Sequence, residues 1–280
     1  MLIFLTALWL EIKEFSNSVF FTAIAGSLAG AFAGAYGAQR IAEKAKYRDQ
    51  LLSEIRSTNT AIMVACGICN SLLSMKKQHV KSLKEEFDTQ KTALLDYQHK
   101  RNLGLIGEDE QFHYKADFET LSLPPLPVDI LQKQVFEKLL LVGRPISLST
   151  TLTQTVHTLS AALEKRNQQI EIYKKKNGAT TAEYFGLLVG GQINEIYPSL
   201  IKIIYDHTDD GIFFSQLLCH DLIEHGNQVV EQFNKNFKKG APAISKTDFS
   251  KSEKLGLMPS ADNYADWNKM FPKIPIKASK

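Results

Sequence analysis

The feature that most constrains this chain is an uncharged stretch of 20 residues, 19–38, with the sequence VFFTAIAGSLAGAFAGAYGA. As an α-helix, such a stretch spans about 30 Å, which is the thickness of the hydrocarbon layer of a membrane. The alternative is a buried helix of a soluble protein, but such a helix seldom continues directly into several basic residues. The sequence therefore predicts a single transmembrane helix over 19–38, with the lipid bilayer as a partner.

Basic residues set the expected orientation of this helix. Four of them follow the apolar stretch closely: Arg40, Lys44, Lys46 and Arg48. Only Lys13 precedes it. Because Lys and Arg beside a membrane helix stay in the cytoplasm, we expect the N-terminus outside and the bulk of the chain inside. The alternative is a cleaved signal peptide, since residues 33–35 fit an A-x-A cleavage site. We expect residues 1–18 to form a short extracytoplasmic or interfacial segment.

Small residues recur at every fourth position of the apolar stretch, in the manner of a glycine zipper. They are Thr22, Gly26, Gly30, Gly34 and Ala38. Apolar contact alone gives little drive for association in lipid, but a small face lets two helix backbones approach closely. The alternative is that glycine and alanine are simply common in membrane helices. The spacing predicts an association face that binds a second copy of the chain or another membrane protein.

Residues 39–237 carry the periodicity of helices. Between 40 and 101 there is no proline, and apolar residues recur at alternating spacings of three and four, which predicts one long helix with a buried seam. The seam consists of Leu52, Ile55, Ile62, Cys66, Cys69, Leu73, Val80, Leu83, Phe87, Leu94 and Tyr97. Three polar residues interrupt it, namely Asn59, Lys76 and Gln90, and this pattern fits a bundle or a coiled coil equally well.

Prolines and glycines divide the rest of the chain. A connector over 102–127 ends in several prolines, and helices are expected over about 128–142, 144–176, 181–205 and 212–237, with a kink at Pro198. Residues 207–211 suit a turn. The predicted fold is all-α, with the transmembrane helix continuing into a long helix and an antiparallel cytoplasmic bundle over 39–237.

Residues 238–280 are rich in lysine and lack periodicity, so we expect a flexible basic tail. Its aromatic residues Tyr264, Trp267 and Phe271 suit docking on the bundle or on a partner, and its lysines suit contact with anionic lipid. Tail docking, lipid contact and the absence of any role stay open as alternatives.

Composition and motifs argue against several functions. The formal net charge of +3 is too small to indicate nucleic-acid binding, and three cysteines cannot form a disulfide framework. The sequence holds no G-x-G-x-x-G, phosphate-binding loop, G-x-S-x-G or H-E-x-x-H motif. We therefore expect no cofactor and no common hydrolase or nucleotide site.

Two groups of residues have the composition of a chemical site. Cys66 and Cys69 form a C-x-x-C, but their place in the seam of a helix favours buried thiols over a zinc or redox site. His220 and His225 are five residues apart, about 140° around a helix, and therefore do not bind one metal together. With Glu224 and Asp221 they are expected to form ordinary surface pairs. We expect no metal site.

The layout of anchor, long helix and bundle is common among bacterial inner-membrane proteins, including some phage-defence and toxin-type membrane proteins. Our leading hypothesis is a non-enzymatic scaffold that assembles through its small-residue face and binds a cytoplasmic protein. The alternative is an effector whose gathered helices permeabilise the bilayer. The third hypothesis is a membrane-bound enzyme or metal protein that uses Asp221 and Glu224.

Overall fold

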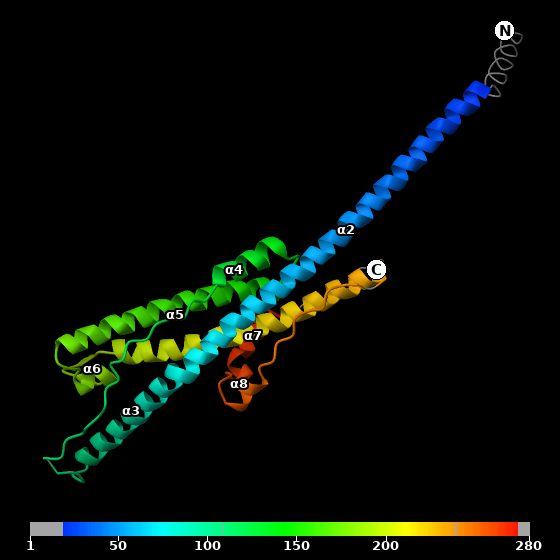
Figure 1. Ribbon diagram of the computed structural model, residues 1–280. Coiled ribbons are helices and arrows are strands. Elements are labelled where there is room, and N and C mark those ends of the chain that lie inside the picture. The colour runs from blue at the N-terminus through cyan, green and yellow to red at the C-terminus, as the bar shows by residue number, and fades with distance from the viewer. Residues whose placement is uncertain (1–18, 108, 239, 274–280) are drawn as a thin grey trace, which may run out of the picture.

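The structure, a computed structural model, describes residues 19–107, 109–238 and 240–273, which are predominantly helical (Figure 1). Helix α2 (Val19–Met75) passes through a π-helical turn, η1 (Lys76–Val80), into α3 (Lys81–Asn102). The predicted long helix is thereby confirmed. The expected interfacial segment over 1–18 lies outside the described residues.

The remaining elements pack against this long helix or against each other. In chain order they are α4 (Val128–Lys133), the π-helical η2 (Gln134–Lys138), α5 (Arg144–Lys175), α6 (Thr181–Phe185), β1 (Leu188–Val189), β2 (Gln192–Ile193), α7 (Ile196–Phe237), α8 (Ser250–Lys254), the 3₁₀ turn η3 (Ala261–Tyr264) and α9 (Ala265–Met270).

Helix α7 is the centre of the bundle, because it packs against both α2 and α5 (Figure 1). It runs antiparallel to α2. The side-chain amide of Gln232 donates to the Tyr47 hydroxyl at 2.6 Å, and the Cys69 thiol, further along α2, donates to the Ile212 carbonyl at 3.7 Å. The main hydrophobic core joins α2, α5 and α7 with α4 and the C-terminal segment. The coarse prediction of an all-α helical bundle is confirmed.

The expected turn over 207–211 is wrong, since α7 continues through it without a break. Gly211 lies in the middle of the helix, where a Cβ atom would stand 2.6 Å from Leu72 Cδ1. Its small size therefore permits close packing of α7 on α2. Thr208 is buried and its hydroxyl donates to the Ile204 carbonyl at 2.7 Å, an ordinary helix contact.

The expected helix over 181–205 is also wrong. It is replaced by the short α6, a hairpin and the first turns of α7. Gly186 ends α6 with a φ of 69°, and Gly190 and Gly191 form the hairpin turn with φ values of 58° and 80°. Pro198 lies in the first turn of α7, where a proline needs no kink. Gly186 and Gly190 thus serve left-handed turns.

The segment after α7 differs from the expected flexible tail, because its described residues fold back onto the bundle. Phe249, Leu257 and Tyr264 are buried in the main core. The Tyr264 ring stacks on the Phe213 ring with centroids 3.7 Å apart and an angle of 5° between their planes. Of the alternatives for this segment, docking on the bundle describes these residues.

Candidate functional site

The apolar N-terminal part of α2 extends beyond the bundle (Figure 1). Its large side chains are exposed: Ile24 is 42% exposed, Leu28 54% and Phe32 74%. Over 22–38, all residues are exposed except Gly37, which is half-buried. This segment is therefore not a core helix of its own bundle.

The helix that carries this segment is long and apolar enough to cross a membrane. Half of its qualifying window is buried, however, and the core helix of a soluble protein also passes this test. For this helix, the exposed fraction of its residues is therefore more informative than their hydropathy. The exposure of residues 22–38 separates this apolar segment from the buried continuation of the same helix.

The small residues of this segment line an open face. A Cβ atom added at Gly26, Gly30 or Gly34 would meet no atom within 4 Å. A spacing of four residues advances about 40° around an α-helix, so these three glycines stay within about 80° of one another. Thr22 and Ala38, at the ends of the predicted face, turn further away. The three glycines therefore form the continuous central part of the predicted face.

The four predicted orientation-setting residues follow the apolar segment on α2, and all are exposed: Arg40, Lys44, Lys46 and Arg48. The Arg40 guanidinium lies 4.8 Å from the centroid of the Tyr36 ring, a cation–π contact at the boundary between apolar and charged sequence. Helix α7 ends beside this basic part of α2, where the Phe237 ring centroid is 6.0 Å from Lys44 Nζ.

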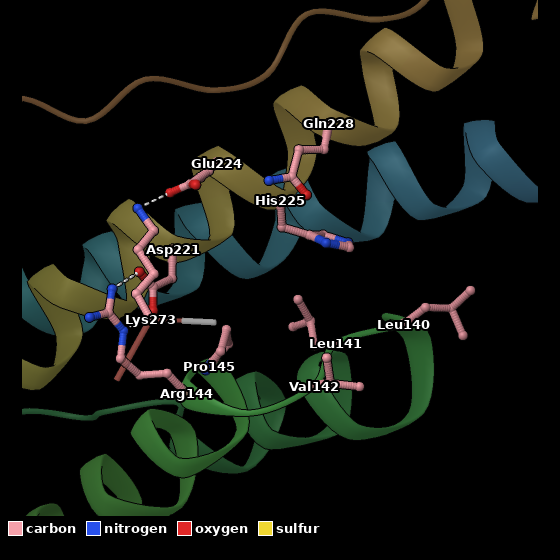
Figure 2. Close-up of a pocket in the computed structure, with 10 residues that line it drawn as sticks. All are labelled: Leu140, Leu141, Val142, Arg144, Pro145, Asp221, Glu224, His225, Gln228 and Lys273. Atoms are coloured by element: carbon pink, nitrogen blue, oxygen red, sulfur yellow. Dashed lines mark hydrogen bonds and ion pairs between the residues drawn. The ribbon is translucent and has the colours of Figure 1, made fainter. Parts of the chain in front are cut away.

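A pocket lies between the start of α5 and the middle of α7 (Figure 2). Arg144 forms a two-point ion pair with Asp221, Nε to Oδ2 at 2.8 Å and Nη2 to Oδ1 at 2.5 Å. Hydrogen bonding and the charge of Asp221 raise the pKa of Arg144. Figure 2 shows Lys273 paired with Glu224 at the same wall. Both carboxylates of the third functional hypothesis are thus held in ion pairs.

The expectation of a surface pair between Asp221 and His225 is wrong, and Glu224, which was expected to pair with His220, pairs with Lys273. Asp221 and His225 share a buried face of α7 and reach different partners. His225 Nε2 lies 2.9 Å from Glu54 Oε1 of α2, while Asp221 binds Arg144 of α5. The two inward residues link α7 to both neighbouring helices.

The pocket is small, with a volume of about 50 Å³. Pockets for small-molecule ligands measure roughly 300–1,000 Å³, whereas one water molecule takes up about 30 Å³. Within the described residues, no group of three or more His, Cys, Asp or Glu side chains is placed to hold a metal. This geometry gives no support to catalysis or metal binding at Asp221 and Glu224.

The two cysteines of the C-x-x-C differ in their surroundings. Cys69 is buried and Cys66 is half-buried. Burial raises the pKa of the Cys69 thiol to about 12, and it also raises the pKa of Cys219. Both sulfurs donate to backbone carbonyls across the α2–α7 contact, Cys219 to Ile62 at 3.8 Å. Cys69 and Cys219 therefore lie in the core, as we expected for Cys69, whereas the half-buried Cys66 differs from the expected buried pair.

Sequence reasoning did not predict the partners of two buried charged residues, Lys76 and Arg166, which link segments of the bundle. Lys76, at the start of η1, pairs with Asp209. Arg166 of α5 is fully buried and donates to the Glu119 carbonyl of the connector at 2.8 Å. The sequence did carry a signal for both residues, because each stands at an apolar position of its helix.

No family model, curated protein or solved structure matches the chain.

Proposed function

We propose that the chain is a membrane-anchored, non-enzymatic scaffold of the bacterial inner membrane. Residues 19–38 form its single transmembrane helix, the N-terminus is outside, and the bundle binds a protein partner in the cytoplasm. The observation that carries the proposal is the exposure of this apolar segment, because the other long helices that the structure describes bury their apolar faces in the bundle. Leaving a Leu, Ile or Phe side chain in water costs about 1.5–3 kcal/mol, so this segment needs an apolar environment.

The glycine face supports assembly in the membrane. Helices with glycine at every fourth position cross in a right-handed sense at small separations, because no side chain keeps the backbones apart. Among the described residues, a Cβ atom added at Gly26, Gly30 or Gly34 would meet nothing within 4 Å. Either a second copy of the chain or another membrane helix fits this face, and we propose the second copy.

Apolar side chains beside the pocket support the cytoplasmic partner. Leu140 is 83% exposed and Val142 66% exposed, on the turn that leads from η2 into α5 (Figure 2). Contiguous exposed apolar groups of this kind are typical of protein interaction surfaces. The small, ion-paired pocket next to them offers no room for a substrate. A binding surface without catalysis is the simplest use of this region.

Membrane fractionation tests the anchor. Full-length protein should sediment with membranes, resist extraction by salt and dissolve in detergent, and a reporter fused after Lys280 should be active only in the cytoplasm. A matched variant with Leu28→Lys and Phe32→Lys places two charges in the apolar segment, each costing about 2.5–3.5 kcal/mol there, and should shift the protein to the soluble fraction. Wild-type protein that is soluble without detergent would overturn the proposal.

Crosslinking in membranes tests the glycine face. Gly30→Leu should reduce the yield of crosslinked dimer, because it separates the two backbones. Ala25→Leu adds the same bulk about 140° from the centre of the glycine face and should leave the yield unchanged. Equal yields in the two variants would mean that assembly, if present, does not use these glycines.

The alternative is an effector that permeabilises the bilayer and uses the same glycine face. It differs from a scaffold in its effect on the membrane potential of the cell. Induced expression with a potential-sensitive dye should leave the membrane potential unchanged for a scaffold. Depolarisation by the wild type that is lost in Gly30→Leu and kept in Ala25→Leu would replace the scaffold with the effector.

A further inference from the structure

The C-terminal end of α7 is fixed beside the basic part of α2. The Phe237 ring centroid lies 6.1 Å from that of Tyr47, whose hydroxyl accepts a hydrogen bond from the Gln232 side chain. One turn further into the bundle, the two helices share a buried apolar cluster of Leu51, Ile55, Val229 and Phe233. The end of α7 is therefore held at the level of residues 44–47 of α2 (Figure 1).

This level is close to the surface of the membrane in which we place residues 19–38. Lys44 follows Ala38 by six residues, and Tyr47 by nine, which corresponds to about 9 and 14 Å along a straight helix. The polar headgroup layer extends roughly 5–8 Å beyond the hydrocarbon on each side. The distance from the end of α7 to the headgroups is thus within about one Debye length, ~8 Å at physiological salt.

Positive charge is concentrated at this level. Six exposed basic residues lie there, four of α2, one of α7 and the residue that follows α7: Arg40, Lys44, Lys46, Arg48, Lys235 and Lys238. The carboxylates at the same level are those of Glu43, Asp49 and Glu231, so the net charge of these nine residues is +3. The whole chain carries the same net charge, +3, which means that the rest of the sequence is balanced and this end of the bundle is not.

The helix dipole explains only part of this pattern. A cation in the last turn of a helix, such as Lys235, interacts favourably with the carbonyls at its C-terminus. That effect acts within one turn and gives no reason for the four basic residues of α2, which lie in the interior of a long helix. The orientation rule gives a reason for those four. Neither the helix dipole nor the orientation rule explains why these four basic residues lie at the same level as the end of α7.

We propose that these six residues form a basic collar that binds the phosphates of anionic lipid headgroups in the adjacent leaflet and holds the end of α7 against the bilayer. The inference rests on the proposed function, because it needs residues 19–38 in the membrane. Its partner is the lipid surface itself. Each Lys or Arg near an anionic surface strengthens attraction by about fivefold, so the two lysines at the end of α7 contribute a measurable share.

Amide hydrogen exchange on the full-length protein in lipid nanodiscs tests the collar. Discs of phosphatidylcholine alone are compared with discs that also contain about 30% phosphatidylglycerol, an anionic lipid. At about 50 mM salt, exchange in residues 228–238 should be about fivefold slower in the anionic discs, and the difference should disappear at about 500 mM salt. Residues 165–175, at the far end of α5, should exchange equally in both discs (Figure 1).

Charge reversal supplies the matched variants. Lys235→Glu with Lys238→Glu should abolish the effect of the anionic lipid on residues 228–238. Lys174→Glu with Lys175→Glu reverses the same charge at the end of α5 distant from residues 19–38 and should preserve it. All four lysines are exposed, so neither pair disturbs the core, and equal thermal midpoints in neutral discs check this.

The outcomes separate the collar from the anchor. Equal exchange in the two kinds of disc, or an unchanged lipid effect in the variant of α7, overturns the collar and leaves the membrane anchor in place. A protein that does not copurify with either disc overturns the proposed function, and the collar with it.

Discussion

Lys76 and Asp209 form an ion pair inside the bundle, with Nζ and Oδ1 2.5 Å apart and side chains that are 4% and 15% exposed. The same ammonium group donates to the Leu257 carbonyl at 3.0 Å and lies 5.3 Å from the centroid of the Tyr205 ring. One lysine thus joins the start of η1, the middle of α7 and the C-terminal segment. Burial raises the pKa of Asp209, against the opposing effect of Lys76.

Removing one partner of this pair should destabilise the protein strongly. Lys76→Met leaves the buried Asp209 carboxylate unpaired, which costs about 3–5 kcal/mol in comparable cases. The double variant Lys76→Met with Asp209→Leu removes both charges and should recover most of that loss. Denaturant unfolding in detergent measures the three free energies of unfolding. A double variant as unstable as the single one would show that the ion pair is not the source of the loss.

Two glycines in helix interiors should respond to alanine with opposite signs. At Gly67 a Cβ atom meets nothing within 4 Å, so Gly67→Ala should stabilise the protein by up to about 1 kcal/mol through helix propensity. At Gly211 the new Cβ atom would clash with Leu72, so Gly211→Ala should destabilise it by about 1–3 kcal/mol. Thermal unfolding of the two variants is the measurement. Stabilisation by both would contradict the close contact of α7 with α2.

The three thiols should differ in reactivity. Cys69 and Cys219 are buried with raised pKa values and are protonated at about pH 8, whereas Cys66 is half-buried. With a thiol reagent, we expect one fast-reacting cysteine in native protein and three after denaturation. Cys66→Ser should abolish the fast reaction. Fast reaction of two or more thiols, or zinc bound by the native protein, would contradict the interpretation of the C-x-x-C as core.

Asp210 should make the stability depend on pH in the direction opposite to ordinary acid denaturation. It accepts a hydrogen bond from the Tyr264 hydroxyl at 3.1 Å and lies 3.2 Å from His207 Nδ1, but burial has the largest effect and raises its pKa. A carboxyl with a raised pKa binds more protons in the folded state than in the unfolded state. Its contribution to stability therefore grows as the pH falls toward its ordinary pKa and is lost as the pH rises.

Asp210→Asn removes this titration and keeps an oxygen that accepts from Tyr264. Between about pH 5 and pH 7, the free energy of unfolding of wild type should fall more, or rise less, than that of the variant. Parallel pH profiles would contradict the raised pKa. Glu224→Gln, a carboxyl at the surface of the same helix, serves as the comparison because no buried partner depends on it.

The helices that could be predicted from the sequence are those whose apolar period is long and whose ends are marked. The long helix after residue 19 and α5, which starts at Arg144-Pro145, were predicted for this reason. The sequence was misleading where one residue type serves two purposes. Gly211 resembles a turn residue but permits a helix crossing, and only the position of Leu72 distinguishes the two uses.

Long-range pairing was the part of the candidate site that local spacing did not reveal. Asp221 and His225 are one helical turn apart and were expected to pair with each other. Their actual partners, Arg144 and Glu54, are 77 and 171 residues away in the chain. The same holds for the C-terminal segment. Phe249, Leu257 and Tyr264 lie in no long helix, yet each contributes its side chain to the core.

The uninterrupted helix from Val19 through Met75 fixes the rotational phase between the apolar segment and the bundle. No hinge separates the glycine face from the helix face that packs on α7. Inserting a single alanine between residues 38 and 44 would turn the bundle by about 100° relative to the glycine face and move it by about 1.5 Å. In a symmetric dimer that uses the glycine face, each copy presents one side of its bundle to the other copy. The number of residues between the glycine face and the bundle therefore determines which side that is.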